Sequence, residues 1–150
     1  MLIDGVLNSD QFAKYCLDEE GYDPFDNDDL DPRAITNLKN IVNETSAAIV
    51  LSSSWRWDEA SYKAVERQLR FYGLEIADTT EKNYKPGLNS RTAEIQDYLE
   101  QHPSITKFVI LDDDEIKEPL KNHWVRCLFK DGLTKKLAKE AIQILKEKNG

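Results

Sequence analysis

Short apolar runs that lead directly into polar residues constrain the fold of this chain more than any other feature. One run covers residues 47–51 and another covers residues 108–111, while residues 1–3 form a shorter one. Continuous apolar runs of this length are typical of strands that are buried on both faces of a parallel sheet. The sequence therefore predicts at least three buried strands, each followed by polar side chains.

The segments between these runs have the apolar spacing of helices. Apolar residues recur three and four positions apart in residues 32–42, 58–71, 90–102 and 134–147. Asp31 before a proline predicts a helix start, with Asp as N-cap and Pro at the first helical position. Alternating strands and helices with short connections predict an α/β fold: a doubly wound, mostly parallel sheet with helices on both faces.

The length of 150 residues fits one domain, residues 1–150, with a single core. Residues 8–30 are rich in acids and contain Gly and Pro, so we expect an irregular, flap-like insertion there. Residues 1–3 are shorter than a usual strand of about five residues, which predicts a truncated first strand. An exposed edge beside that short strand is expected to favour a homodimer.

Composition and charge limit the classes of partner. The formal net charge is −8, which argues against general, sequence-independent binding of nucleic acid. No apolar run approaches the roughly 18 residues that cross a bilayer, and the first residues lack the features of a signal peptide, so no membrane association is expected. Cys16 and Cys127 lie far apart in the sequence, which predicts reduced thiols and a cytoplasmic location.

Three polar clusters follow the three predicted strands. Asp4 comes after the first, Ser52 after the second, and a run of three aspartates, residues 112–114, after a later one. In open α/β sheets, ligands bind beyond the carboxyl ends of the strands. Core packing alone gives no reason for this arrangement. The sequence therefore predicts one functional site that contains all three clusters.

The aspartate run predicts a metal site. Adjacent carboxylates repel one another unless a divalent cation or protons neutralise them. Oxygen ligands of this kind suit Mg²⁺, which accepts one or two protein carboxylates and keeps several waters. The three aspartates, Asp112, Asp113 and Asp114, are the candidate ligands. The alternative is a solvated acidic turn that caps a short helix.

A serine run predicts a phosphate site next to the metal. Ser52 and Ser53 offer hydroxyl and backbone N–H groups at a strand end that leads into a helix. An ordinary serine-rich N-cap is the alternative. Arg56 is a candidate contact for the anion, although a surface ion pair explains it equally well.

A phosphoryl group held among carboxylates also requires a cation. Lys85 in a predicted loop and Arg91 at a predicted helix start are the two candidates. Each alone is more often a solvated surface residue. Chemistry does not choose between them at the level of the sequence.

The order of these motifs resembles the haloacid dehalogenase (HAD) superfamily of magnesium-dependent phosphohydrolases. Residues 3–8 look like its first motif, residues 49–52 like its second and residues 111–113 like its fourth, while Lys85 or Arg91 stands for the third. More narrowly, the segment IVLSSSWR at residues 49–56 is similar to a small capless group. That group is related to HAD domains of RNA-repair and polynucleotide-phosphatase proteins.

The resemblance implies a role for each matching residue. Asp4 would be the acid/base, and its backbone carbonyl would face the metal. Ser52 would bind phosphate, while Asp112 and Asp113 would hold Mg²⁺ directly or through water. In the family, an aspartate two positions before the acid/base attacks phosphorus and forms an aspartyl-phosphate. Leu2 stands at that position here, so we expect an inactive or nearly inactive chain.

Two explanations of Leu2 stay open. In the first, the sequence represents an altered or late-starting version of an active phosphatase. Alternatively, it is a natural pseudophosphatase: a non-catalytic module that binds a phosphate group, a nucleotide or a protein. The resemblance alone indicates the ligand, which is a phosphorylated small molecule or a nucleic-acid end.

Overall fold

The fold is built on a five-stranded parallel sheet with the strand order β3-β2-β1-β4-β5. The computed structural model describes residues 1–3, 6–24, 29–52, 59–80 and 90–147. The strands are β1 (Leu2–Ile3), β2 (Ile49–Leu51), β3 (Ile76–Thr79), β4 (Ile110–Asp112) and β5 (Trp124–Arg126). Their parallel order confirms the predicted doubly wound α/β class.

The shortest strand, β1, lies at the centre of the sheet. Leu2 pairs with Val50 on one side and with Ile110 on the other. The expectation that a short first strand leaves an exposed edge is therefore wrong, because both sides of β1 are hydrogen-bonded and β3 and β5 are the edge strands. A homodimer stays a prediction, but without this physical basis.

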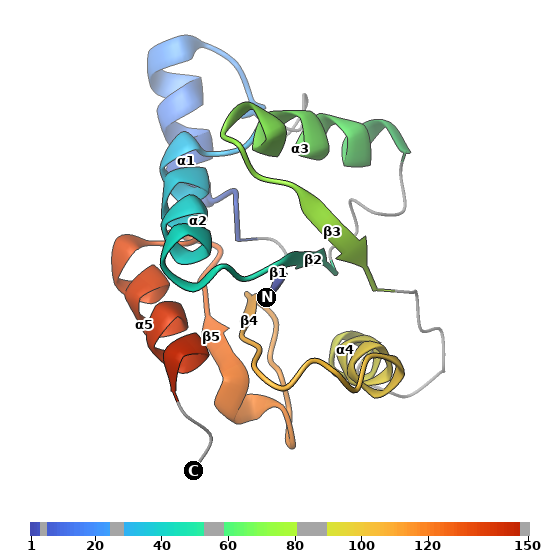
Figure 1. The fold of residues 1–150 in the computed structure, drawn as a ribbon. Helices are drawn as coiled ribbons and strands as arrows, with labels where there is room; N and C mark the ends of the chain where they lie inside the picture. The colour runs from blue at the N-terminus through green and yellow to red at the C-terminus, as the bar shows by residue number, and fades with distance from the viewer. Residues whose placement is uncertain (4–5, 25–28, 53–58, 81–89, 148–150) are drawn as a thin grey trace.

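Helices cover both faces of the sheet (Figure 1). The larger apolar cluster joins one face to helices α2 (Pro32–Thr45), α3 (Glu59–Phe71) and α5 (Lys135–Lys146). The smaller cluster joins the other face to α4 (Ser90–Gln101). None of the helices within the described residues has the length and apolar character needed to cross a membrane.

Local sequence signals set the helix ends. The Asp31 side chain accepts a hydrogen bond of 3.0 Å from the Arg33 N–H and caps α2, as the sequence predicts. Helix α3 ends at Phe71, and Gly73 two residues later has a φ of +81°, which lies in the left-handed region. The next N–H, that of Leu74, donates to the Leu69 carbonyl at 2.9 Å and closes the last turn.

The described part of residues 8–30, which leaves out residues 25–28, contains more helix than the sequence predicts. It contains a short helix, α1 (Asp10–Tyr15), followed by a π-helical turn, η1 (Cys16–Glu20), so an irregular loop was the wrong expectation. The Ser9 hydroxyl accepts from the Phe12 N–H at 3.1 Å, and the Phe12 ring is buried. A capping serine and one apolar anchor fix this helix, although its sequence is too short to show a helical period.

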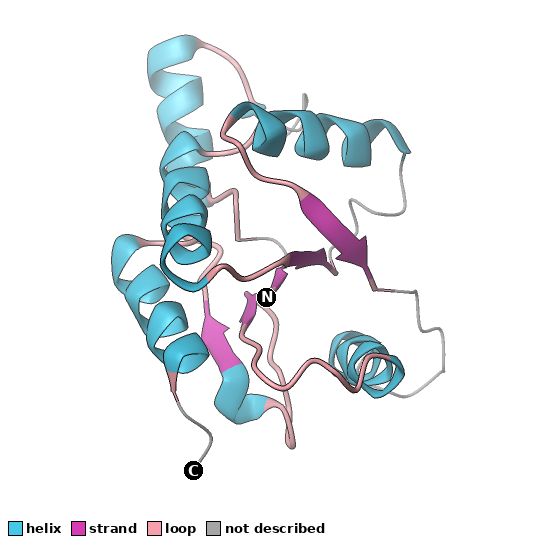
Figure 2. Cartoon of the chain, in the orientation of Figure 1, coloured by secondary structure: helices cyan, strands magenta, loops and turns pink. Residues whose placement is uncertain are grey.

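The connection between β4 and β5 contains no full α-helix. Figure 2 shows a short helical turn directly before β5, which is the 3₁₀ helix η4 (Lys121–His123). The short connection matches the sequence prediction. It leaves the carboxyl end of β4 next to that of β5, with Asp112 in register with Arg126.

Candidate functional site

The site lies where one face of the sheet changes from apolar to polar. Leu2, Val50 and Ile110 are in register and belong to the cluster that α4 covers. Side chains alternate along a strand, so residues two positions further along lie on the same face. Ser52 and Asp112 occupy these positions, and both are fully buried. The structure thus brings the serine and aspartate clusters to the same edge.

The Asp112 carboxylate is buried but well contacted. Its Oδ1 accepts from the Asp114 N–H at 2.9 Å, and its Oδ2 lies 3.4 Å from Arg91 Nε. The Trp124 indole N–H donates to the Asp112 backbone carbonyl at 3.1 Å. Burying a carboxylate costs free energy unless hydrogen bonds or an opposite charge compensate for it. The contacts of Asp112 therefore allow its side chain to be buried in the charged form.

Arg91 reaches into the site from the first turn of α4. Its Nη1 donates to the backbone carbonyl of Ser52 while its Nε faces Asp112, and its side chain is only 16% exposed. The guanidinium therefore links β2 and β4, the two strands that flank β1. Of the two cations that the sequence leaves open, Arg91 lies at this edge and Lys85 lies outside the described residues. The role of Arg91 in phosphate binding stays a prediction.

Three carboxylates gather after β4. The side chains of Asp112, Asp113 and Asp114 place one oxygen each within 4.8 Å of one another. They are buried, half-buried and exposed, in that order. An all-oxygen donor set that is open on one side fits Mg²⁺, which keeps part of its water shell. The residues present therefore fit the metal that the sequence predicts.

The Ser52 hydroxyl has a partner within the fold. It donates to the Ile3 carbonyl at 3.2 Å, and the Ser52 N–H donates to the same oxygen at 3.0 Å. To bind a phosphate oxygen through this hydroxyl, Ser52 must exchange its contact with Ile3. The other predicted site residues lie outside the described residues: Asp4, Ser53, Arg56 and Lys85.

Thr80 is a buried polar residue at this edge that the sequence analysis missed. It follows β3, is 2% exposed, and donates its N–H to the Leu51 carbonyl at 3.0 Å. The pairing of β2 with β3 shifts between Ile49 and Val50. A shift of one residue exchanges the two faces of a strand, so sequence periodicity gives no reliable face for Thr80. Its only sequence signal is a hydroxyl at the end of an uncertain strand.

Cys127 lies behind the aspartate run on the other face of the sheet. Its N–H donates to the Asp112 carbonyl at 3.1 Å, and its thiol is buried. Burial first, and then the charges of Asp112 and Asp113, raise the pKa of this thiol to about 12. The thiol is therefore protonated near neutral pH, and it does not provide a nucleophile in place of the missing aspartate.

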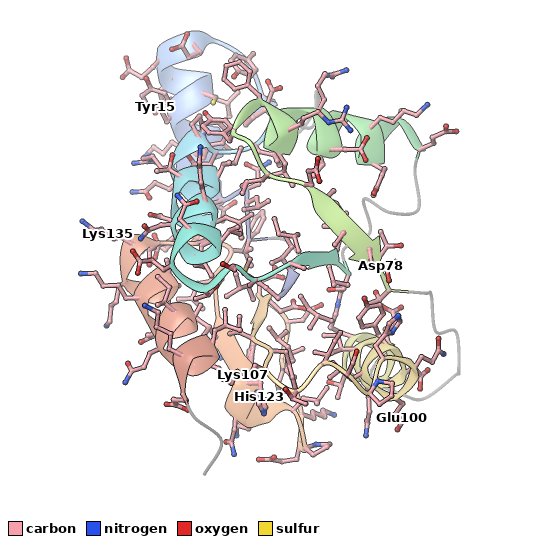
Figure 3. The ribbon with its side chains drawn as sticks, in the orientation of Figure 1. Tyr15, Asp78, Glu100, Lys107, His123 and Lys135 are labelled. Carbon is pink, nitrogen blue, oxygen red and sulfur yellow. The ribbon has the colours of Figure 1, made fainter. Side chains whose placement is uncertain are left out.

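A polar network on α4 lies outside this edge. Asp78 of β3 accepts a hydrogen bond of 3.0 Å from the Tyr98 hydroxyl, and Figure 3 shows Asp78 beside α4. His102 stacks on the Tyr98 ring at 4.1 Å between centroids. Burial and the bond to Asp78 raise the pKa of Tyr98 to about 12. Asp78 is level with Val50, so it marks the α4-facing side of β3.

A cavity of about 400 Å³ lies at the opposite edge of the sheet. Ala48, Ile49 and Leu74 contribute to its lining, which places it at the amino end of β2. It contains none of the polar groups that gather near Asp112. Within the described residues, the polar groups near Asp112 therefore lie at the carboxyl edge and outside this cavity.

The parallel five-stranded sheet with acids at the end of a central strand is consistent with a HAD-like α/β domain of the phosphatase class. A family model described as the HAD domain in Swiss Army Knife RNA repair proteins matches residues 3–138. The chain belongs to this family. The match begins at Ile3, so it does not include Leu2. No curated protein and no solved structure matched the chain.

Proposed function

We propose that this domain binds a phosphate group together with Mg²⁺. It hydrolyses the phosphomonoester bond of its ligand very slowly or not at all. The observation that carries this proposal is the environment of Leu2. Its side chain is 1% exposed and packs in an apolar cluster, at the position where the family has its nucleophile. A hydrocarbon side chain has no lone pair, and losing a covalent nucleophile typically lowers the rate by several orders of magnitude.

The sequence contains the residues that we propose as contacts with the ligand. Asp112 and Asp113 would hold the metal, with Asp4 as the third oxygen donor by family resemblance. Bound Mg²⁺ would supply positive charge that offsets the phosphate and the carboxylates. Arg91 and Ser52, which already contact each other, would hold phosphoryl oxygens. These features favour a non-catalytic phosphate- or nucleotide-binding module, a pseudophosphatase, over a working hydrolase.

The family description suggests the class of ligand. Relatives of this family occur in RNA repair proteins, so a phosphorylated nucleic-acid end is the ligand that we propose, with a phosphorylated small molecule as the alternative. The net charge of −8 supports contacts confined to such an end, because a longer polyanion is repelled by the average field. Two free, buried cysteines support a cytoplasmic setting.

The proposal is tested with a generic phosphatase assay in Mg²⁺ on three chains: the wild type, Leu2→Asp and Leu2→Asn. We expect no measurable turnover from the wild type, a gain for Leu2→Asp and none for Leu2→Asn, which has the same size but no charge. Circular dichroism in the same buffer checks that each variant folds. Wild-type turnover that Asp112→Asn abolishes would overturn the non-catalytic proposal, and a folded Leu2→Asp chain without activity would overturn the lost-nucleophile explanation.

The metal site is tested separately by calorimetric titration of Mg²⁺. Asp112→Asn and Asp113→Asn are each expected to weaken Mg²⁺ binding, because each removes one negatively charged oxygen donor. Titration of the wild type needs no variant to fold. If both variants bind Mg²⁺ as the wild type does, the proposed ligands are wrong.

A further inference from the structure

The Thr80 hydroxyl is a buried polar group that has no hydrogen-bond partner among the described residues. Thr80 is 2% exposed, and no residue that the structure describes forms a hydrogen bond with its Oγ1. Buried side-chain hydroxyls in native proteins are nearly always hydrogen-bonded, so an exception requires an explanation. A ligand that binds there is one such explanation, and the position of Thr80 in the sheet supports it.

The register of β3 places this hydroxyl in the candidate site. Val50 is level with Asp78 and Leu51 with Thr79, and the Thr80 N–H donates to the Leu51 carbonyl at 3.0 Å. Continuing this register puts Thr80 level with Ser52. Asp78 bonds to Tyr98 of α4, so the side chain two positions further along β3 also lies on the α4 side.

Thr80 therefore extends the polar row by one strand. From the outer strand inward, the row contains Thr80 and Ser52, and Asp112 lies beyond β1. Neighbouring strands are about 4.8 Å apart, so the two hydroxyl-bearing residues are separated by roughly that distance. A tetrahedral oxyanion can bridge such a span with two O–H···O bonds of about 2.7 Å each.

We propose that Thr80 is a ligand-binding residue whose hydroxyl donates to a phosphate oxygen on the side of Ser52 away from the aspartates. Arg91 would contact the phosphate from α4, and the aspartates would hold the metal on the far side. Thr80 adds a donor there without adding charge. This inference rests on the proposed function, because it assigns one more contact to the same phosphate.

Thr92 provides a matched control within the chain. It is also buried, at 7% exposed, but its Oγ1 accepts a hydrogen bond of 3.2 Å from the Lys117 N–H. Replacing Thr92 with valine removes a hydrogen bond of the fold. Replacing Thr80 with valine removes a hydroxyl that has no such bond. The two substitutions are chemically identical, so they separate a structural role from a ligand-binding role.

The test measures the affinity for inorganic phosphate in Mg²⁺ by calorimetry and the melting temperature without phosphate. The wild type is compared with Thr80→Val, Thr80→Ser and Thr92→Val. We expect Thr80→Val to weaken phosphate binding about tenfold, the effect of one hydrogen bond to an anion, and to melt at or above the wild-type temperature. Thr80→Ser keeps the hydroxyl and should bind as the wild type does. Thr92→Val should melt earlier and bind phosphate normally.

Each other outcome overturns the inference. Thr80→Val that binds phosphate as tightly as the wild type, or that melts well below it, would mean that the hydroxyl serves no ligand. Equal losses of affinity for Thr80→Val and Thr80→Ser would mean that any change of shape at this position weakens phosphate binding, and that the hydroxyl has no specific role. A wild-type chain that binds no phosphate at all would overturn both this inference and the proposed function. The outcomes for the Thr80 variants concern this inference alone and leave the proposed function intact.

Discussion

Two neighbouring rows of side chains on the same face of the sheet have opposite chemistry. The apolar row consists of Val50, Leu2 and Ile110, which pack under α4. The polar row lies two residues further along the same strands and includes Ser52 and Asp112. Both rows are almost completely buried, so exposure to water does not explain the difference.

The two rows are stabilised by different interactions, and this difference separates the core from the candidate site. The apolar row contacts Ile95 and Tyr98 in the smaller cluster, and its stability comes from the removal of apolar surface from water. The polar row is held by ion pairing and hydrogen bonds, with Arg91 as its cation. Leu2 belongs to the apolar row. Its burial therefore fits the packing of the core. Under the proposed function, the same residue leaves the site without a nucleophile.

The largest expected effect is that of placing a charge in the apolar row. Without metal at pH 7, Leu2→Asp is expected to lower the free energy of unfolding by about 4 kcal/mol, since it removes packing and buries a carboxylate. Urea denaturation measures this change. Burial raises the pKa of the new carboxyl, so the loss should grow as the pH rises above about 4.

Leu2→Asn is the control, because it shares the lost packing but does not titrate. The penalty for Leu2→Asp should also shrink in Mg²⁺, since a bound ion stabilises the folded state. If Leu2→Asp lowers the free energy of unfolding by less than about 1 kcal/mol at pH 7 without metal, water reaches the apolar row. The proposed difference between the two rows would then be wrong.

The next effect comes from removing a charge from the polar row. Asp112→Asn is expected to lower the free energy of unfolding by about 3 kcal/mol, because the buried Arg91 guanidinium loses its carboxylate partner. Chemical denaturation without metal measures it. Asp114→Asn is the matched control at an exposed position and should change stability by less than about 0.5 kcal/mol. Equal effects of the two substitutions would contradict the buried ion pair.

The smallest effect is a pH dependence on the other face of the sheet. The pKa of Cys127 is raised from 9.0 to about 12 in the folded chain. A folded-state pKa above the unfolded one means that this stabilisation is complete below pH 9 and is lost as the pH rises toward 12. We expect about 1–3 kcal/mol to disappear over this range.

Urea denaturation at pH 8, 10 and 11 is the measurement, with Cys127→Ala beside the wild type. The alanine variant should lose less stability over this range, although it begins lower because of the cavity that it creates. Asp113→Asn should flatten the curve slightly, since that carboxylate helps to raise the pKa of the thiol. Parallel curves for the wild type and Cys127→Ala would contradict this account.

The sequence predicts best those elements whose formation depends on residues that are adjacent in the chain. The apolar runs predict β2 and β4, and Asp31 predicts the start of α2, because burial and capping depend on a few adjacent residues. The acidic segment at residues 8–30 was predicted as irregular, and its helix is fixed by Phe12, whose burial depends on the rest of the fold. The family resemblance is confirmed over residues 3–138.

The candidate site divides in the same way. The sequence alone determines which side chains are candidates for the site: the aspartates at residues 112–114, Ser52, and Leu2 at the position where we expect a nucleophile. Only the tertiary structure decides that β1 is central, that Arg91 is the cation facing Asp112, and that Thr80 is level with Ser52. Residue types and the short spacings of apolar residues can be recognised directly in the sequence. Strand order, register and the reach of a helix depend on pairings between residues that are distant in sequence, and no local pattern encodes those pairings.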